Sequence, residues 1–386
     1  MSFRSSLSKK IKSFEKVFDV YNNIYISRSA ILNNFDLFTQ LSPGGFVIPV
    51  LKSNAYGHGL EQITEILKAR RFPYIAVDGY FEGLKIHEIS QQPVLVMGAI
   101  KNSNYANIKP RGYAFVVHDI DSIKAIGQTK KTFLVHIDLE TGMGRHGVRI
   151  DKLDSLLNEI KKYKNISVEG VMTHLADADN PKSVKHVNLQ TSRFDIGVKM
   201  IIDAGFSPKY IHIAQSAGSV KVKSKYANTL RIGIALYGIT PLEKSDNLAN
   251  KLQNLQPALK LTSTIDKVLE INCGESVSYG CTFIAKRSSR IGILPSGYYE
   301  GIPRALSNVG QVKWRNKYLP ITGRVCMNHT MIDITNCNAK KNDEVVVISN
   351  DARDQLSLNN ICLKYNLFNY ELLVGLNQNI RRTIVE

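Results

Sequence analysis

The feature that most constrains the fold is an alternation of short apolar runs with amphipathic segments up to about residue 240 of the 386-residue chain. Helical periodicity follows most of the runs, as in residues 60–70, 151–163 and 185–204. Eight strands joined by helices are the number that closes a parallel barrel, so the pattern predicts an α/β fold of the TIM type, a (β/α)8 barrel. An open doubly wound sheet is the alternative at this level. The runs are FVIPVLK (46–52), YIAV (74–77), PVLVMG (93–98), YAFVV (113–117), TFLVHID (132–138), VEGVMT (168–173), YIHI (210–213) and TLRIGIALYG (229–238).

The character of the sequence changes after about residue 240. Strand-like runs follow one another there, separated by Gly, Asn and Asp turns with little helix between them. We therefore expect an N-terminal extension over 1–22, the barrel over 28–240 and a mostly-β C-terminal domain over 241–386. The runs in the last domain are ALKLTSTIDKVLEI, ESVSYGCTF, SRIGILPS, GQVKWRNKYLPIT and DEVVVISN.

Composition excludes several classes of protein. With 44% hydrophobic residues the chain can bury a large core, and it has neither an apolar run long enough to cross a bilayer nor a visible secretory signal. The five cysteines are odd in number and lack a CxxC pair, which favours reduced thiols and a cytoplasmic location. The net charge of +17 comes from scattered lysines without interleaved aromatics, so we predict a solvated basic surface and neither a nucleic-acid nor a membrane partner.

Lys52 is the residue of the barrel half that most requires an explanation. It is the only charge in the run 46–52, and it stands where the predicted strand gives way to a turn of Ser, Asn and Gly. Lysine is seldom buried without a partner, so this one is either an exposed strand end or an amine held for chemistry. In a barrel the chemistry lies at the C-terminal ends of the strands, where other polar residues are also expected. These are Arg145, His174, Ser216 and Arg231.

This combination of residue types indicates a cofactor site. A strand-end lysine, Gly-flanked turns, and hydroxyl and backbone donors after the last strands suit a phosphate-bearing aldehyde such as pyridoxal phosphate. A metal-dependent barrel hydrolase would instead carry an HxH pair at a strand end. The sequence has none, so no metal site is predicted.

Nine short blocks, in the same order along the chain, resemble the alanine racemase family. The resemblance runs from about residue 24 to the C-terminus and implies a pyridoxal-phosphate barrel followed by a β domain, with the first strand, 23–27, joining that domain. It also implies a homodimer with shared active sites, which interconverts L- and D-alanine and so supplies D-alanine for peptidoglycan. The blocks are LKSNAYGHG, ETGMGRHGV, THLADAD, HIAQSAG, LRIGIALYG, VSYG, LPSGYYEG, GRVCMNH and YELL.

By this resemblance Lys52 holds the cofactor covalently, and Tyr279 faces it across the substrate. Racemisation removes the α-proton from one face of a planar intermediate and returns it on the other, and a single base cannot reach both faces. The unperturbed pKa values of an amine and a phenol lie near 10, so both must be lowered toward the operating pH. Their positions in different domains suit groups that approach from opposite sides.

The resemblance assigns roles to further residues. Arg231 matches the arginine that contacts the pyridine nitrogen, and because a guanidinium only donates, it leaves that nitrogen unprotonated and favours racemisation over transamination. His174 falls between Arg231 and Tyr279. The phosphate contacts are matched by Tyr56, Ser216, Tyr370 and the backbone amides of Gly233 and Ile234, and the contacts to the substrate carboxylate by Arg145 and the Met327 amide.

Some positions depart from the family pattern. Asp138 stands seven residues before Arg145, where many members carry a lysine converted to a carbamate, and we expect its carboxylate to supply that charge and hold Arg145. Asn328 and Glu300 each stand where the family usually has Asp. Asn328 lies near the substrate carboxylate in the family layout, so it can broaden the range of amino acids accepted. Tyr298 is expected to support the same region.

Other functions remain open on the sequence alone. A racemase of another or broader range of amino acids would share every motif. A non-enzymatic pyridoxal-phosphate-binding protein shares the barrel and the lysine, but lacks a C-terminal domain with a second base. Basic amino-acid decarboxylases share both domains, yet they carry a Cys-Asp pair that this chain does not have.

Overall fold

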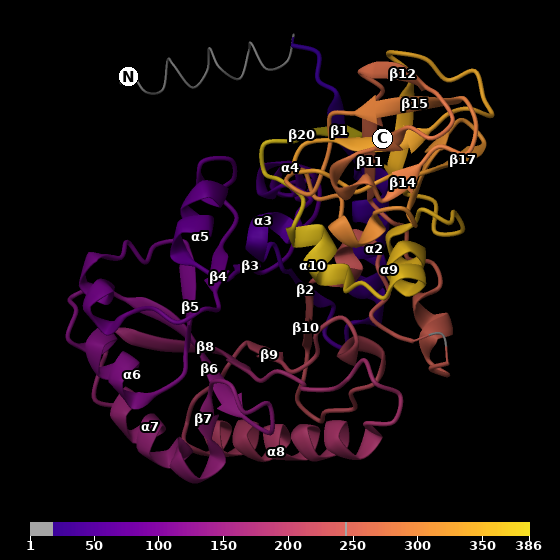
Figure 1. Cartoon of the computed structure of the whole chain (residues 1–386). Helices are drawn as coiled ribbons and strands as arrows, with labels where there is room; N and C mark the ends of the chain where they lie inside the picture. Colours follow the sequence, from indigo (N-terminus) through magenta and orange to yellow (C-terminus); the bar gives the residue numbers. More distant parts are fainter. Residues whose placement is uncertain (1–17, 244) are drawn as a thin grey trace, which may run out of the picture.

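The computed structural model describes residues 18–243 and 245–386. They form a parallel barrel and a second, mostly-β part beside it (Figure 1). Parallel pairing runs in the order β3, β4, β5, β6, β8 and β9, and β2 pairs with β10. A bridge between Val50 and Ala76 joins β2 to β3, and the Arg231 N–H donates to the Ala214 carbonyl beyond β9, which closes the ring. The barrel strands are β2 (Phe46–Pro49), β3 (Ile75–Val77), β4 (Val94–Val96), β5 (Tyr113–Val117), β6 (Phe133–Glu140), β8 (Ile166–Met172), β9 (Tyr210–His212) and β10 (Thr229–Ile232).

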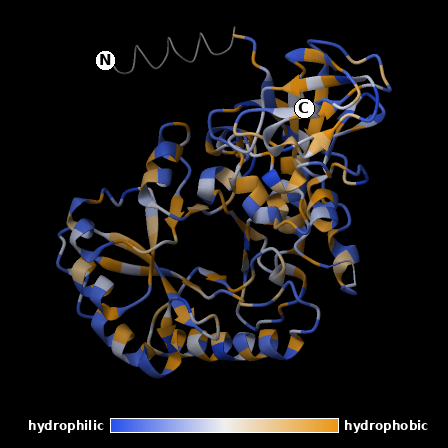
Figure 2. Ribbon diagram, in the orientation of Figure 1, coloured by the Kyte–Doolittle hydropathy of each residue, from blue (hydrophilic) through white to orange (hydrophobic). Residues whose placement is uncertain are grey.

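The predicted (β/α)8 barrel is thus confirmed, and helices surround it as expected. In α7 the buried residues recur at the spacing of one helix face: Leu153, Leu156, Leu157 and Ile160. Figure 2 shows hydrophobic residues along the barrel strands and a mixture of hydrophobic and hydrophilic residues on the helices around them. The helices of this part are α2 (Arg28–Leu41), α3 (Lys52–Tyr56), α4 (Leu60–Leu67), α5 (Tyr80–His87), α6 (Ile120–Gly127), α7 (Leu153–Ile160) and α8 (Val184–Asp203).

Strand register decides which side chains meet inside the barrel. Val116 and Met172 belong to the apolar cluster that fills its interior. Val116 lies opposite His136 on β6, and Met172 lies opposite both Asp138 on β6 and His212 on β9. Because side chains alternate along a strand, His136 and Asp138 point into the barrel together. The interior is therefore apolar at one end and polar toward the C-terminal mouth.

The C-terminal part contains an antiparallel framework with one parallel edge. Among the described residues its largest sheet has the order β17, β16, β19, β11, β1 and β20, so the first strand of the chain lies inside it, antiparallel to β11 and parallel to β20. The members of this sheet are β1 (Asn22–Ser27), β11 (Leu259–Thr264), β16 (Gln311–Trp314), β17 (Lys317–Pro320), β19 (Glu344–Ile348) and β20 (Arg381–Val385). The smaller elements are β12 (Lys267–Ile271), β13 (Ser276–Val277), β14 (Phe283–Ile284), β15 (Ser289–Leu294), β18 (Thr330–Asp333), α9 (Leu358–Tyr365) and α10 (Asn369–Val374).

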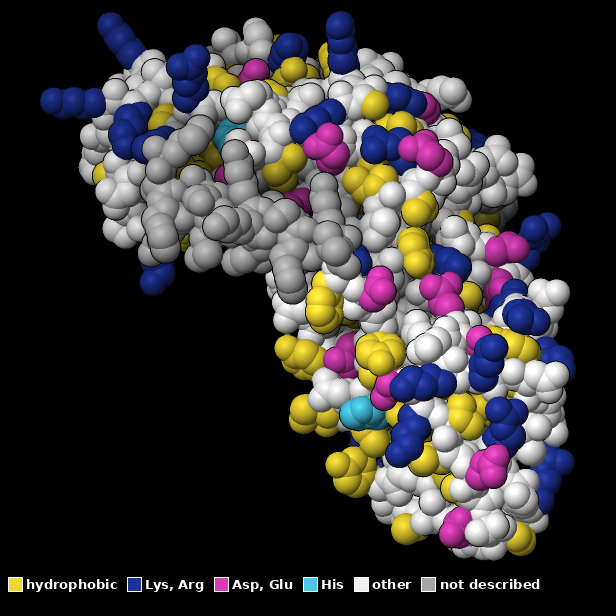
Figure 3. Space-filling model, turned by 90° about the horizontal axis from the view of Figure 1, so that it is seen from above, with side chains coloured by type: hydrophobic (Ala, Val, Ile, Leu, Met, Phe, Trp, Pro, Cys, Tyr) yellow, Lys and Arg dark blue, Asp and Glu magenta, His cyan; other side chains and the backbone are white. Residues whose placement is uncertain are grey.

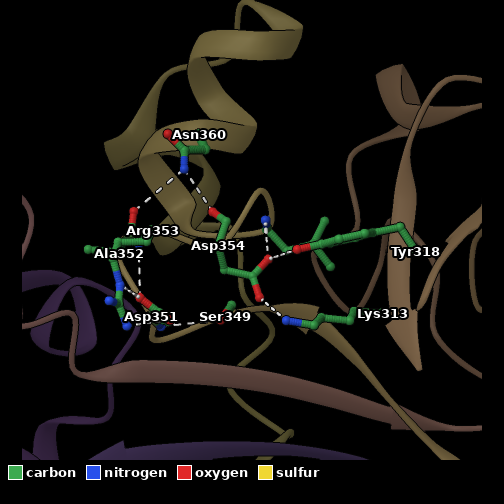
Figure 4. A network of polar contacts seen from close by, with 9 residues as sticks. Lys313, Tyr318, Ser349, Asp351, Ala352, Arg353, Asp354 and Asn360 are labelled. Carbon is green, nitrogen blue, oxygen red and sulfur yellow. Dashed lines mark hydrogen bonds and ion pairs between the residues drawn. The ribbon is translucent and has the colours of Figure 1, made fainter. Parts of the chain in front are cut away.

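A polar network around Asp354 ties the helical end of this part to its sheet (Figure 4). The Asp354 carboxylate accepts hydrogen bonds from Tyr318 at 2.9 Å and from Lys313, which come from the β16–β17 hairpin. Its backbone carbonyl accepts from the Asn360 side chain at 2.7 Å, in the first turn of α9. Burial of a carboxylate is costly unless it is paired, and these donors pair it. The network fixes α9, which precedes α10.

The surface carries charges of both signs. On the face shown in Figure 3, Lys and Arg lie among Asp and Glu over much of the area. Within residues 18–243 and 245–386, no helix is both long and apolar enough to cross a membrane.

Candidate active site

A cavity of about 600 Å³ opens at the C-terminal ends of the barrel strands. Its walls come from the loops after the strands and from α10 of the C-terminal part. The predicted site residues that line it are Lys52, Tyr56, Asp138, Arg145, His174, Ser216, Arg231, Gly233, Ile234 and Tyr370. Parallel strands end at one rim, which explains why residues far apart in the sequence meet there.

Lys52 stands at the start of an unusual backbone segment. The residues after it, from Ser53 to Tyr56, all have φ between 51° and 56°, so α3 is a left-handed turn built without glycine. Such a turn costs roughly 1–2 kcal/mol per residue and persists only where its surroundings enforce it. Glu82 accepts from the Ser53 N–H at 2.7 Å, and the Asn54 side chain accepts from the Leu60 N–H at 2.9 Å. The turn directs the chain away from β2 and leaves Lys52 on the cavity wall.

Arg231 is buried, and its hydrogen bonds fix its orientation. Nη1 donates to the carbonyl and to Nδ1 of His212, at 2.6 and 2.8 Å, and Nη2 donates to the Thr173 carbonyl at 2.7 Å. Burial lowers the pKa of Arg231 to about 10, so it remains charged at neutral pH. The described residues offer no hydrogen-bond acceptor to Nε, which leaves that N–H for a group in the cavity.

The arginine also fixes the protonation of two buried histidines. A guanidinium only donates, so His212 Nδ1 accepts and the ring hydrogen of His212 is on Nε2. Nε2 lies 2.8 Å from His136 Nδ1, which therefore accepts in turn. Burial, followed by the charge of Arg231, lowers the pKa of His136 to about 3 and that of His212 well below its usual value. Both rings are neutral, so they hold Arg231 without adding a positive charge that would repel it.

His174 lies among the cations of the cavity. Burial, together with the charges of Arg231, Arg145 and Lys52, lowers its pKa to about 3. The imidazole is therefore neutral at physiological pH. Three cations around one uncharged histidine produce a positive field suited to an anionic ligand.

Hydroxyl groups and backbone N–H groups at the C-terminal end of β10 form a pocket for a phosphate. Gly233 has no side chain, and a Cβ there would lie 2.5 Å from the Tyr56 hydroxyl. Ser216 is buried, and its hydroxyl accepts from the Ala235 N–H at 3.3 Å. The Tyr370 ring reaches in from α10, with its centroid 6.0 Å from that of Tyr56. Hydroxyls and backbone N–H groups in the short turn after β10 suit the phosphate of pyridoxal phosphate, and Lys52 and Arg231 suit its aldehyde and ring nitrogen. The residues present fit this cofactor.

Asp138 does not make the expected ion pair with Arg145 in the part of the chain that the structure describes. Its Oδ2 instead lies 3.1 Å from Nδ1 of His118, the residue after β5. The physical reason is register: Val117 lies opposite Ile137, so the next pair along the strands is His118 and Asp138. Asp138 still acts on Arg231 through its charge, which raises the pKa of Arg231 against the larger effect of burial.

The remaining predicted residues lie outside this cavity. Tyr279 is 71% exposed and borders a separate hollow of the C-terminal part with Cys326 and His329. Met327 is also exposed, and the Asn328 side chain donates to Glu300 at 2.9 Å. Tyr298 lies on the adjoining loop, where its N–H donates to the Cys326 carbonyl. A single chain therefore does not bring Tyr279 and Met327 to Lys52.

Two residues that the sequence analysis did not assign belong to the site. His212 holds Arg231, and His118 holds Asp138. Both follow or end strands already identified, so their position at the barrel mouth could have been inferred from the strand pattern. Their partners could not, because pairing depends on register.

Comparison with known proteins supports this description. The model of the alanine racemase N-terminal domain matches residues 26–241, and that of the C-terminal domain matches residues 258–384. The chain is 32% identical over 370 residues to alanine racemase 2 of Caldanaerobacter subterraneus subsp. tengcongensis, covering 94% of each protein. It is 32% identical over 366 residues to the alanine racemase of Methanococcus maripaludis, covering 92% of this chain and 96% of that one.

Solved structures agree. The alanine racemase of Bacillus anthracis, solved with bound L-Ala-P, matches with a TM-score of 0.86 and 26% identity, covering 96% of each chain. The alanine racemase of Streptomyces lavendulae has the same fold, with a TM-score of 0.86, 22% identity and coverage of 96% of this chain and 98% of that one. On the strength of its barrel, its cavity and both domain matches, this chain belongs to the alanine racemase family.

Proposed function

We propose that the protein is a pyridoxal-phosphate-dependent alanine racemase that supplies D-alanine for peptidoglycan in the cytoplasm. The observation that carries the proposal is the cavity itself, where Lys52, a buried Arg231 and a phosphate pocket around Gly233 line one space. The named relatives, which are alanine racemases, support the choice of alanine as substrate.

Lys52 and Tyr279 act as the two bases. When bound, pyridoxal phosphate stabilises the negative charge left on the α-carbon of an attached amino acid. Lys52 Nζ moves the α-proton on one face, and the Tyr279 hydroxyl moves it on the other. Arg231 would donate a hydrogen bond to the ring nitrogen without protonating it, because a guanidinium is too weak an acid to transfer its proton at neutral pH. Arg145 and the Met327 amide bind the substrate carboxylate.

The active unit is a homodimer in which each site is shared. Tyr279 and Met327 are exposed on the C-terminal part of a single chain, away from the cavity that contains Lys52. A second copy can present them to that cavity, and this arrangement also supplies the second face that the reaction needs.

The decisive experiment follows both proton exchange and inversion. Purified protein with pyridoxal phosphate is incubated with individual L-amino acids in deuterium oxide, and solvent exchange at the α-carbon is measured together with formation of the D-isomer. We expect exchange and inversion to be fastest with alanine. Inversion of other amino acids at comparable rates would indicate a racemase of broader range. Cofactor binding without any exchange would indicate a non-enzymatic pyridoxal-phosphate-binding protein and would overturn the proposal.

The lysine assignment has its own test. Borohydride reduction of the holoprotein should fix the cofactor to Lys52, and the Lys52→Ala variant should neither racemise alanine nor retain a fixed adduct. An adduct on another lysine, mapped by peptide mass spectrometry, would refute the assignment.

A further inference from the structure

His118 occupies a position between two parts of the cavity wall. It follows β5 directly, and the register of β5 and β6 places it opposite Asp138. On its other side lies His146, whose ring centroid is 4.9 Å from that of His118. His146 is the residue after Arg145. One imidazole thus contacts both the carboxylate of β6 and the loop that carries the arginine.

The contact with Asp138 is a directed hydrogen bond. The two side chains are largely buried, with exposed fractions of 14% for His118 and 10% for Asp138. An ionised carboxylate accepts but cannot donate, so His118 Nδ1 is the donor in this contact. His118 Nε2 is buried and has no hydrogen-bond partner in residues 18–243 and 245–386. The ring is therefore held by Asp138 on one edge and by packing elsewhere.

The loop that carries Arg145 needs such support. Gly142, Gly144 and Gly147 have φ values of 141°, 67° and 107°, which gives the loop a backbone of high intrinsic freedom. Glu140 fixes its base by accepting from the N–H groups of Gly142 and Gly144, at 2.5 and 2.9 Å. Arg145 itself lies beyond these bonds and is exposed in the single chain.

The charges around this loop explain why Asp138 must stay in place. Arg145 and Arg231 both line the cavity, and their positive charges repel each other. Asp138 is the carboxylate that opposes this repulsion at Arg231. Without it, Arg145 is expected to turn toward solvent, where its charge is screened, because Arg231 is locked by four hydrogen bonds and cannot move.

We propose that His118 is a positioning residue for the substrate-binding loop, which it holds through its hydrogen bond to Asp138 and its ring contact with His146. It thereby keeps Arg145 directed at the carboxylate of the amino-acid substrate. This inference rests on the proposed racemase function and adds to it a residue of the cavity wall that acts through Asp138 and His146.

Three substitutions separate the two contacts. His118→Asn places an amide N–H near the position of Nδ1 and loses the ring contact. His118→Phe keeps a ring against His146 and loses the hydrogen bond, and His118→Ala loses both. His87→Ala, which changes a histidine on α5 outside the cavity, is the matched control.

The holoenzyme variants are compared by KM and kcat for L-alanine. We expect His118→Ala to raise KM about tenfold, the scale of a lost hydrogen bond to a charged group, with a smaller change in kcat. The KM values of His118→Asn and His118→Phe should lie between those of His118→Ala and the wild type, and the KM of the control should equal that of the wild type. Wild-type KM in all three His118 variants would overturn the proposal, as would equal losses in kcat and cofactor content, which would indicate a merely structural role.

A binding measurement makes the test independent of turnover. Propionate has the carboxylate and methyl group of alanine but no amine, so its dissociation constant from the holoenzyme, measured by calorimetry, reports the carboxylate contacts of Arg145 and the Met327 amide without any turnover. The dissociation constant should increase about tenfold in His118→Ala, as KM does. A wild-type protein that binds propionate in this His118-dependent manner but inverts no amino acid would contradict the racemase function while supporting the role of His118.

Discussion

At the scale of single residues, we propose that the Asp138 side chain takes the place of a chemical modification. Its carboxylate is part of the chain, lies on the cavity wall and opposes the repulsion between two arginines. The family resemblance places it where a carbamylated lysine otherwise supplies the negative charge. A residue that already carries the charge needs no carbon dioxide.

We expect Asp138→Asn to raise KM for alanine about tenfold and to lower turnover less, with the cofactor still bound, because the amide keeps the shape and removes the charge. Wild-type activity should be the same in carbon-dioxide-free buffer and with added bicarbonate. Steady-state kinetics in both buffers tests this. Unchanged kinetics in Asp138→Asn, or a wild-type enzyme that needs bicarbonate, would show that Asp138 does not take the place of the carbamate.

The buried histidine pair predicts how stability depends on pH. His136 is neutral in the fold because burial lowers its pKa to about 3, whereas in the unfolded chain its pKa is near 6.5. Between these values the unfolded state binds the extra proton, so the free energy of unfolding falls as pH decreases from about 6.5 toward 3. His212 adds to the effect in the same direction.

We expect the urea midpoint of the wild-type protein to decrease as the pH is lowered from 7 to 5. In His136→Asn the midpoint should decrease less over the same range. The asparagine oxygen can accept from His212 Nε2 as the imidazole does, but it does not titrate. Urea melts of both proteins at several pH values give the two slopes. Identical slopes would mean that His136 does not contribute to the acid sensitivity.

At the scale of elements, the turn after Lys52 stores strain that can be measured. Ser53 adopts φ 55° in a left-handed turn, and glycine reaches that region without a steric cost. We expect Ser53→Gly to stabilise the protein by roughly 0.5–1 kcal/mol, the relief of strain less the added freedom of the unfolded chain. The thermal unfolding temperature of the holoenzyme should rise by about 1 °C.

Gly57→Ala is the matched control for Ser53→Gly, with the opposite expected effect on stability. Gly57 also has positive φ, and a Cβ there would lie 2.0 Å from the Leu373 carbonyl oxygen at the end of α10. This substitution should lower the unfolding temperature, because it adds both strain and a clash. If both variants shifted the temperature in the same direction, the turn would not be the source of the strain.

Much of the element pattern could be predicted from the sequence, for a physical reason. A barrel strand such as β5 is buried on both faces and so reads as an apolar run, and α7 shows its inner face as Leu153, Leu156 and Ile160. The left-handed turn gives no such signal, since Ser53 and Ala55 are ordinary residues in a conformation that only tertiary contacts enforce. His118 was missed for a related reason, because its partner is set by the register of β5 against β6.

At the scale of the whole molecule, the residues proposed for the site lie on two separate surfaces of the chain. Lys52 lines the barrel cavity, whereas Tyr279 and Met327 project from the C-terminal part into solvent. The exposed Tyr299 lies beside them, since its N–H donates to the Met327 carbonyl. An exposed group of large apolar side chains is commonly a contact surface. In the proposed dimer it covers the mouth of the partner's cavity and excludes water from it.

Tyr279→Phe tests the second base within this arrangement. Removing the hydroxyl leaves the ring and its packing, so the cofactor should still bind, while racemisation falls by about 10²–10⁴-fold, the range for loss of a general acid or base. Absorbance of the bound cofactor and turnover of alanine are measured on the same preparation. Turnover equal to wild type would remove Tyr279 from the mechanism.

Mixing two inactive variants shows whether the site is shared. In a hybrid dimer of Lys52→Ala and Tyr279→Phe chains, one site carries both substitutions and the other carries neither. Random exchange makes half of the dimers hybrid, so activity should recover to about a quarter of wild type per chain. Lys52→Ala mixed with the Lys52→Ala, Tyr279→Phe double variant is the control, because no combination of those chains restores Lys52. Exchange is verified with differently tagged chains. Since both single variants keep one intact group per chain, a lack of recovery after verified exchange would mean that Lys52 and Tyr279 of the same chain form each site, and the exposed position of Tyr279 would then require a movement of the C-terminal part.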